Sequence, residues 1–407
     1  MTENPRTRRS PQAGTPQTGT PLAGTPSLLR AINDRAALEL LLAHGPLSRT
    51  RIGSLTGLSK PTASQLLARL EAAGLVVPVG TTAGGPGPNA QLYQVNPAAG
   101  YVAGVDVTST HVRVAVADIT GVTLAEHREP TADWPPAETV ARTARAVAQA
   151  VRLAGLPADA LRETVIGIGG ALDPSTGELR YAEHLPGWHS SRLIAELEEA
   201  IGTPVSLEND VNLAAVAEQA VGAAAGCEDF VLLWAEEGIG AAIVIAGRLH
   251  RGFTGGAGEV GYMPVPGAPV VDDLRKEGSG GFQELAGEPA VLALAEAHGL
   301  TAGTAEQAVA LAVESPAGEA FLAALADRLA VGLAVIVSVV DPELLVLSGG
   351  TPTAGGERLR ALVQDALHRI SIPRPEVRCS AVPGSPVLHG ALQRALATAR
   401  DALFTTR

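Results

Sequence analysis

The sequence predicts an α/β fold of two lobes, preceded by a small winged helix-turn-helix domain. Two stretches, residues 101–127 and 230–252, alternate apolar and polar residues as paired strands do, and Ala- and Leu-rich segments follow each of them. Between residues 28 and 74, apolar residues instead recur at helical spacing. The 407 residues are 46 % hydrophobic and 18 % charged, which fits a globular chain of roughly two to four domains.

The N-terminal residues 1–27 predict a disordered leader. The motifs QAGTP, QTGTP and LAGTP repeat every five residues over positions 12–26, and segments so rich in Pro, Gly and Thr bury too little apolar surface to fold. Arg6, Arg8 and Arg9 lie in this leader, but no apolar block follows before Leu28, so a secretory signal is not indicated.

Residues 28–97 predict the winged helix-turn-helix domain. A first helix begins at Leu28, with Leu28, Leu29 and Ile32 among its apolar residues, and ends near Gly45. A second helix spans 48–55, with Ser48 as N-cap and both Ile52 and Leu55 facing inward. The remaining predicted elements are a helix from Ser59 to Gly74 and strands at 75–79 and 91–95, joined by a Gly/Pro-rich loop over 80–90.

The third helix of this domain has the residues expected of a major-groove reader. Its apolar face leaves short polar and basic side chains exposed, as base reading requires. Residues 1–100 carry nine basic against four acidic residues, whereas the rest of the chain carries 21 against 38, so only the N-terminal part suits a polyanion. No Lys or Arg occurs over residues 74–100, so the wing is a poor minor-groove arm. The predicted DNA-binding residues are Ser59, Lys60, Thr62, Ser64, Gln65 and Arg69.

The larger domain, residues 98–407, contains a polar cluster after a predicted strand. Glu208, Asn209 and Asp210 end that strand, and an amide beside a carboxylate suits a sugar hydroxyl, which both donates and accepts a hydrogen bond. The alternative interpretation is that Asn209 and Asp210 only cap the helix that follows, residues 211–219.

Four motifs in this domain occur together in one known family. They are GIGGALDPSTGELRYAEHLPGWH at 167–189, LENDVNLAAVAE at 207–218, GGAGEVGYMPV at 255–265 and VLSGG at 346–350. In order and spacing the chain resembles the ROK family over roughly residues 28–400. That family contains actin-like (ribonuclease H-like) sugar kinases and transcriptional regulators with an added winged helix. The resemblance implies two lobes with a boundary near 218–228 and a C-terminal helix that returns to the first lobe.

The resemblance also implies a sugar site. Asp210 matches the general base of the family's kinases. Asn209, Glu259 and Glu284 match positions that contact sugar in the family. Tyr262 stands where the family has a histidine, and its phenol can still donate one hydrogen bond. His184 and Trp188 have two interpretations, as aromatic groups lining the cleft or as packing residues of a loop.

The phosphate-binding and zinc-binding motifs of the family are altered. Side chains at Thr108 and Ser109 replace the family's two glycines in the stretch 106–110, and Glu236 and Glu237 stand in the second phosphate loop, where carboxylates repel a triphosphate. No catalytic residue is therefore expected, and Asp210 is expected only to bind sugar. Zinc is also not expected, because residues without suitable donors replace its ligands. These replacements are Tyr262, Arg275, Glu277 and Phe282.

The sequence thus predicts a cytoplasmic, DNA-binding regulator of carbohydrate metabolism, a repressor in this interpretation, that binds a sugar or sugar phosphate. Its expected partners are operator DNA and a second copy, as a homodimer or homotetramer, with no cofactor and no membrane contact. The longest nearly apolar run, residues 329–340, is shorter than the roughly 20 residues of a bilayer span. Cys227 and Cys379 form no CxxC motif. Two alternatives stay open: an active ATP-dependent sugar kinase with an added DNA-binding domain, and a regulator that answers to a protein partner.

Overall fold

A computed structural model of the chain describes residues 26–81, 90–131, 134–173, 179–180, 185, 187–271 and 280–405. The chain divides into two compact units, of which unit 1 comprises Met1–Gln94 with Phe404–Arg407 and unit 2 comprises Val95–Leu403. This division lies within a few residues of the predicted boundary between the winged helix and the larger domain. The predicted leader lies outside the described residues except for its last two positions.

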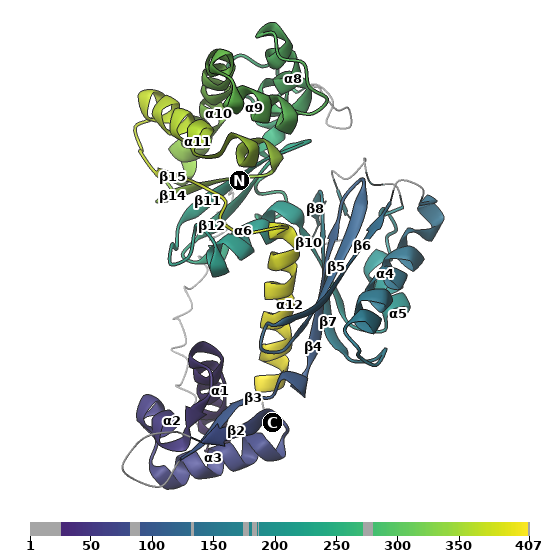
Figure 1. Cartoon of the computed structure of the whole chain (residues 1–407), viewed down its shortest axis with the longest axis vertical. Coiled ribbons are helices and arrows are strands. Elements are labelled where there is room, and N and C mark those ends of the chain that lie inside the picture. The colour runs from purple at the N-terminus through teal and green to yellow at the C-terminus, as the bar shows by residue number, and fades with distance from the viewer. Residues whose placement is uncertain are drawn as a thin grey trace, which may run out of the picture. The chain divides into compact units, whose positions relative to one another are not determined.

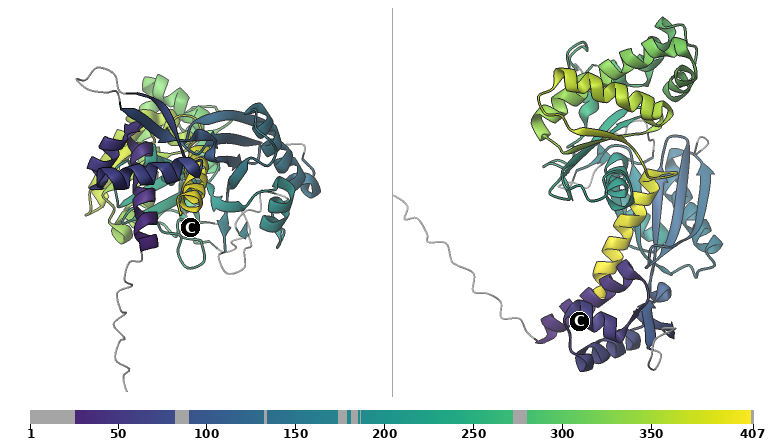
Figure 2. Two further views of the ribbon diagram at one scale, coloured as in Figure 1. Left: turned by 90° about the horizontal axis from the view of Figure 1, so that it is seen from below. Right: turned by 60° about the vertical axis from the view of Figure 1, so that its left-hand side comes forward.

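Unit 1 contains a winged helix-turn-helix (Figure 2). Ser48 caps α2 by accepting a hydrogen bond from the Arg51 amide at 3.3 Å, and Ser59 caps α3 through the Thr62 amide at 3.4 Å. The three short strands form one sheet in the order β1-β3-β2. The elements are α1 (Pro26–His44), β1 (Leu47–Ser48), α2 (Arg49–Thr56), α3 (Lys60–Ala72), β2 (Val76–Thr81) and β3 (Gln91–Val95).

Several apolar residues of unit 1 are exposed. Leu55, which the sequence predicts to face inward, is 37 % exposed, whereas Ile52 is buried as predicted. On α1, Leu28, Leu29 and Ile32 are 49 %, 56 % and 54 % exposed, whereas Leu38 and Leu41 are buried. A helix of 19 residues is about 28 Å long and α2 of eight is about 12 Å, so only part of α1 has helices to pack against. The apolar periodicity of α1 therefore extends beyond the part that is buried.

Unit 2 is built from two lobes with the same strand arrangement (Figure 1). Each has a five-stranded sheet with three sequential antiparallel strands and two further strands added in parallel. The strand orders are β10-β7-β4-β5-β6 and β13-β12-β11-β14-β15. The two-lobed α/β architecture predicted from the duplicated strand pattern is confirmed.

The elements of the first lobe and its connections are η1 (Pro97–Ala99), β4 (Tyr101–Val107), β5 (His111–Asp118), β6 (Thr123–Pro130), η2 (Pro136–Glu138), α4 (Thr139–Leu153), β7 (Leu161–Ile168), β8 (Ala171–Leu172), β9 (Leu179–Arg180), α5 (Leu193–Ile201), β10 (Val205–Asn209) and α6 (Asp210–Val221). Those of the second lobe are β11 (Phe230–Ala235), β12 (Ile239–Ile245), β13 (Arg248–Leu249), η3 (Val260–Tyr262), α7 (Phe282–Ala286), α8 (Glu288–Ala297), α9 (Ala305–Glu314), η4 (Pro316–Gly318), α10 (Glu319–Val340), β14 (Leu344–Ser348), α11 (Gly350–Ile370) and β15 (Glu376–Cys379). The chain then forms α12 (Pro386–Phe404).

The first sheet is covered on both faces, with α4 and α5 on one side and α12 on the other (Figure 1). Because side chains alternate along a strand, β4 directs Ala103, Val105 and Val107 into the core under α4 and α5. Gly104 points the opposite way, where an added Cβ would lie 2.9 Å from the amide of Leu392 in α12. Asp106 shares this face and accepts a hydrogen bond from Ser385 at 2.8 Å, just before α12.

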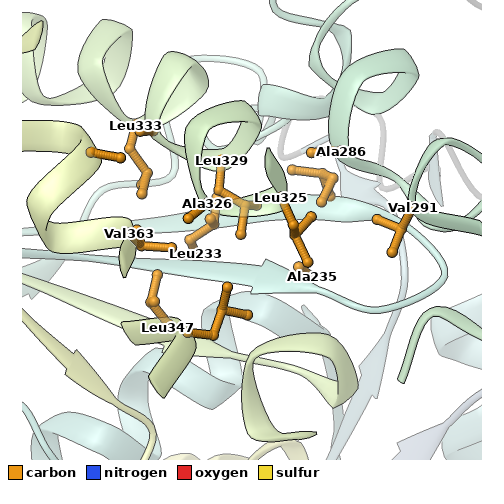
Figure 3. Packing of buried hydrophobic residues seen from close by; sticks show 14 of the residues in the cluster. Leu233, Ala235, Ala286, Val291, Leu325, Ala326, Leu329, Leu333, Leu347 and Val363 are labelled. Atoms are coloured by element: carbon orange, nitrogen blue, oxygen red, sulfur yellow. The ribbon is translucent and has the colours of Figure 1, made fainter. Parts of the chain in front are cut away.

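The largest core lies in the second lobe, between its sheet and the helices α7 to α11 (Figure 3). Leu325, Leu329 and Leu333 of α10 pack there against Leu233 and Leu347 of the central strands. By length and composition, residues 316–340 pass a test for a membrane-spanning helix, but 56 % of the tested window is buried inside the unit. The burial agrees with a core helix, which satisfies the same test.

A buried carboxylate holds the segment that leads from the second lobe to α12. Glu218, near the end of α6, is fully buried and accepts hydrogen bonds from the hydroxyl of Ser380 at 2.5 Å and from the amides of Ala223, Ala381 and Val382. Residues 380–382 follow the last strand of the second lobe. A buried donor that loses its partner costs about 1–3 kcal/mol. Because Glu218 accepts from several donors, it holds residues 380–382 in one arrangement.

We predict that Glu218→Gln destabilises unit 2 by several kcal/mol, because an amide has one acceptor oxygen instead of two and presents an NH₂ group to surrounding donors. Thermal and urea unfolding of the full chain measure this loss. The matched control is Glu228→Gln at an exposed site on the same connection. Equal stability of both variants would show that the hydrogen bonds of Glu218 contribute little to the stability of unit 2.

Candidate functional site

A cleft of about 1600 Å³ opens in unit 2 at the ends of strands from both lobes. It contains every residue that the resemblance assigned to sugar binding, so the structure brings together side chains that lie up to 75 positions apart in the sequence. These lining residues are Asn209, Asp210, Glu259, Tyr262 and Glu284.

Asn209 and Asp210 occupy the junction between β10 and α6. The side chain of Asn209 accepts a hydrogen bond from the Asn212 amide at 2.9 Å and donates to the carbonyl oxygen of Gly170 at 3.0 Å. Asn209 is therefore the N-cap of α6, as the alternative interpretation of the sequence held. Asp210 accepts from the Val211 amide at 2.8 Å, and both side chains remain half-buried in the cleft. Asn209 thus caps α6 and also lines the cleft beside Asp210.

Sequence reasoning missed the support beneath this junction. Glu208 is buried and pairs with Arg251 through two nitrogens at 2.6 and 2.9 Å, and it also accepts from the side chain of Asn212 at 3.1 Å. Arg251 begins the segment that leads to Glu259, so this ion pair ties the two parts of the predicted sugar site together. The sequence did carry a signal for this ion pair, namely a charged residue, Glu208, inside a predicted strand.

Glu259 is close enough to Asp210 for the two carboxyl groups to repel each other. Burial, and secondarily the negative charge of Asp210, raises the pKa of Glu259 from 4.5 to about 7. At neutral pH this group is therefore divided between a carboxylate, which only accepts hydrogen bonds, and a carboxylic acid, which also donates one. Both forms can bind a hydroxyl.

The loop that corresponds to the first phosphate loop is closed by its own side chains. The Thr108 hydroxyl accepts hydrogen bonds from the amides of Thr110 at 3.3 Å and His111 at 3.1 Å, and the Ser109 hydroxyl donates to Glu237 of the second loop at 3.4 Å. Phosphate cradles need backbone amides that point outward without a partner. Two of the amides in this loop have partners within it.

The second loop, residues 236–241, is acidic and likewise closed. Gln283 of α7 accepts from the Ile239 amide at 2.8 Å and donates to the carbonyl oxygen of Glu237 at 3.2 Å. Glu236 opens into the cleft. The surrounding walls desolvate it, and its carboxylate neighbours, above all Glu237 and then Glu306, repel its charge, which raises its pKa from 4.5 to about 7. Gln283 and Glu306 lie in helices remote from both loops in sequence, and no local motif singles them out.

Two of the four positions that the resemblance matches to zinc ligands, Tyr262 and Phe282, are described in the structure. Phe282 is fully buried, and its ring packs directly against Gly332 of α10, where a methyl group would collide with the ring. Tyr262 lines the cleft as a phenol, and the predicted Arg275 and Glu277 lie outside the described residues. Within the described ranges, no group of three or more His, Cys, Asp or Glu side chains is placed to hold a metal ion.

The two aromatic candidates for the cleft have different outcomes. Trp188 is 3 % exposed and belongs to the core under α4 and α5, so it is a packing residue and the interpretation as a cleft residue is wrong. His184 lies outside the described residues. The sequence alone does not specify that Trp188 packs in this core.

A candidate nucleic-acid interface lies on α3 of unit 1. Ser59, Lys60, Thr62, Gln65 and Arg69 are exposed there, as the sequence predicts. Ser64 is only partly exposed, because its hydroxyl donates to the Lys60 carbonyl oxygen and accepts from Arg49.

Two arginines at this interface, Arg69 and Arg49, make contacts that the sequence does not predict. Arg69 forms an ion pair with the buried carboxylate of Asp34 in α1 at 2.5 Å, so it also joins two helices of the domain. Arg49, which sequence reasoning missed, is exposed on α2 and donates to Ser64 at 3.1 Å, so its guanidinium is held against α3. Arg51 is also exposed, but it follows Arg49 by two residues and therefore lies on a different side of α2. Arg49 and Lys60 are thus the cationic side chains beside the start of α3.

Family comparisons give two matches. A family model described as the ROK family matches residues 102–385, and one described as the MarR family matches residues 32–84. The chain is 25 % identical over 359 residues to a xylose repressor of Caldicellulosiruptor bescii, a match that covers 83 % of this chain and 88 % of the repressor.

Solved structures of both a regulator and a kinase are similar. A ROK family transcriptional regulator, a homologue of the E. coli MLC protein, has a TM-score of 0.74 at 19 % identity and covers 93 % of this chain and 99 % of its own. A ROK family glucokinase from Streptomyces griseus, in complex with glucose and AMPPNP, has a TM-score of 0.60 at 25 % identity and covers 72 % of this chain and 99 % of its own.

We predict that Asp210→Asn lowers the pKa of both Glu259 and Glu236, because the negative charge of Asp210 raises both values. Carboxyl-carbon NMR titrations of the wild type and the variant measure the shifts, with Asp341→Asn as a control outside the cleft. The wild-type groups should titrate near pH 7. Between pH 4.5 and 7 the folded chain keeps the protons of Glu236 and Glu259, whereas the unfolded chain releases them. The contribution of these two groups to the free energy of unfolding therefore falls as the pH rises from 4.5 to 7. Wild-type titration near pH 4.5 would contradict the prediction.

Proposed function

The chain belongs to the ROK family, and we propose that it is a transcriptional repressor whose winged helix binds operator DNA and whose cleft binds a carbohydrate effector. The observation that carries the proposal is the combination, in one chain, of an exposed helix-turn-helix with a ROK cleft whose two phosphate loops are closed internally. Similarity to a xylose repressor over most of both chains supports the same assignment.

The DNA-binding part rests on the surface of α3. Polar side chains that can bond base edges, Gln65 foremost, alternate with buried Leu66, Leu67 and Leu70, so the reading face is held by the core behind it. Arg49 and Lys60 supply cations beside that face for phosphate contacts. Base contacts then provide specificity, and the phosphate contacts provide affinity.

The effector part rests on the sugar side of the cleft. Asp210, Glu259 and Tyr262 present carboxyl and phenol groups to one volume, and Asn209 fixes the helix that carries Asp210. Such groups discriminate strongly against ligands without matching hydroxyls, because buried polar groups would then lack partners. Glu284 is exposed at the edge of this volume, where it suits a hydroxyl at the rim.

We further propose that the protein is not a kinase and holds no zinc. Phosphoryl transfer needs the triphosphate to be positioned and its charge neutralised. The amides of Thr110, His111 and Ile239 have partners inside the protein, and Glu236 and Glu237 add negative charge. The rival function, an ATP-dependent sugar kinase, is favoured by the position of Asp210 and by similarity to the glucokinase.

Effector binding is proposed to act through linkage in a cytoplasmic homodimer. Closure of the lobes around a sugar would change the spacing of the two recognition helices, and a coupling of about 1–3 kcal/mol alters operator affinity roughly 5–150-fold. A twofold dimer implies half-sites separated by one helical turn of DNA or a multiple. A homotetramer would repeat the same pair.

We predict that Gln65→Ala weakens specific operator binding by about 1–3 kcal/mol with little effect on non-specific DNA, because it removes a base contact. Arg49→Ala should instead weaken both, and should reduce the slope of log K against log salt by about one, because it removes a phosphate contact. Fluorescence anisotropy on the protein's own upstream region measures both effects. Arg35→Ala, on an exposed arginine paired with Glu39, is the control.

We predict no ATP-dependent phosphorylation when the purified protein is incubated with ATP and a panel of hexoses in a coupled assay. Thermal-shift measurements against the same sugars test the effector proposal, because a ligand that binds the folded state raises its stability. Turnover comparable to that of a dedicated kinase would establish the rival function. A screen without any shift would favour regulation by a protein partner.

A further inference from the structure

The described lining of the cleft is strongly acidic. Eight carboxyl groups face two guanidinium groups, those of Arg113 and Arg328, and no lysine is present among these residues. His111 adds no positive charge at neutral pH, because burial and the neighbouring charges of Arg113 and Arg128 lower its pKa to about 4. The carboxyl groups are those of Asp106, Asp210, Glu236, Glu237, Glu259, Glu284, Glu288 and Glu306.

The two arginines differ in their partners. Arg328 donates to the carbonyl oxygens of Leu285 and Ala290 at 3.3 and 3.1 Å, which fixes its guanidinium on the wall of the second lobe. Arg113 lies directly across from Asp106 in the pairing of β4 with β5, and its Nε is buried without a hydrogen-bond partner. Arg328 therefore does not offer the unoccupied fork with which arginine binds phosphate, and Arg113 alone faces the carboxyl groups of the cleft.

The helix starts in the cleft face carboxyl groups of the protein itself. The first turn of α6 carries Asp210 and is capped by Asn209. At the start of α11, a Cβ on Gly350 would lie 3.1 Å from a carboxylate oxygen of Glu306 and 3.7 Å from the side chain of Glu236. The positive end of this helix dipole therefore faces the protein's own carboxylates, in the place where an external anion would otherwise be stabilised.

The third helix start, at α12, is occupied in the same way. The Ser385 hydroxyl accepts from the Leu388 amide at 3.2 Å and donates to Asp106 at 2.8 Å. Together with the internally bonded amides of the two former phosphate loops, this removes donors that a phosphate group would need in exchange for its water. A sugar hydroxyl has the opposite requirement, since it donates to carboxylates and carries no charge.

We propose that the effector is an unphosphorylated carbohydrate and that the acidic nucleotide side of the cleft excludes sugar phosphates. This inference rests on the proposed carbohydrate-binding function and narrows its ligand class. A phosphate dianion in this volume would meet repulsion from the carboxylates of Glu237 and Glu306 and from the ionised fraction of Glu236. The exclusion is set by Glu236, Glu237 and Glu306, whereas the sugar is held by residues around Asp210.

Matched pairs of probes test this inference on the full-length protein by isothermal titration calorimetry. The pairs are glucose with glucose 6-phosphate, N-acetylglucosamine with its 6-phosphate, and fructose with its 6-phosphate. The wild type should bind at least one free sugar about tenfold or more tightly than its phosphate. The variants Glu236→Gln and Glu306→Gln should each reduce the ratio of free-sugar affinity to sugar-phosphate affinity. They should do so by strengthening the binding of the sugar phosphate, with the affinity for the free sugar unchanged.

The control is Glu314→Gln, which removes an exposed carboxylate from the same helix as Glu306, eight residues away from it. It should leave the ratio of affinities unchanged. A wild type that binds a phosphate as tightly as its free sugar, or more tightly, would overturn the exclusion and leave the effector proposal standing. Binding of neither member of any pair would overturn both.

Discussion

The packing of α6 against α12 is the constraint on which the arrangement of unit 2 depends. α6 packs on the sheet of the second lobe through Val211, Ala214 and Ala215, while α12 packs on the sheet of the first lobe opposite Gly104. The two helices approach so closely that a Cβ on Gly390 would collide with the carbonyl oxygen of Leu213. Each lobe is thus held by a helix that also contacts the other lobe's helix, and the cleft opens beside this contact.

One helix therefore carries both the site and the connection between the lobes. α6 begins at Asn209 and Asp210 in the cleft and ends at Glu218, whose carboxylate holds residues 380–382 after the last strand of the second lobe. A ligand that draws Glu259 toward Asp210 acts on the same rigid element that Glu218 fixes at its other end.

Two segments of the cleft are held by interactions within the chain. The Thr108 hydroxyl accepts hydrogen bonds from the amides of Thr110 and His111, which closes the loop over residues 108–110. The buried Phe282 ring packs against Gly332 and anchors the start of α7. Both segments therefore keep their shape without an external group.

The sequence by itself determined the α/β class, the winged helix, the capping residues and the residue types around the cleft. It could do so because periodicity, Ser caps and the Glu208-Asn209-Asp210 cluster are local patterns. Only the tertiary structure decided that Trp188 packs in the core, that Arg69 pairs with Asp34, and that Glu306 meets Glu236 at Gly350. Burial and charge partners depend on which distant segments meet, and no local pattern of residues specifies that encounter.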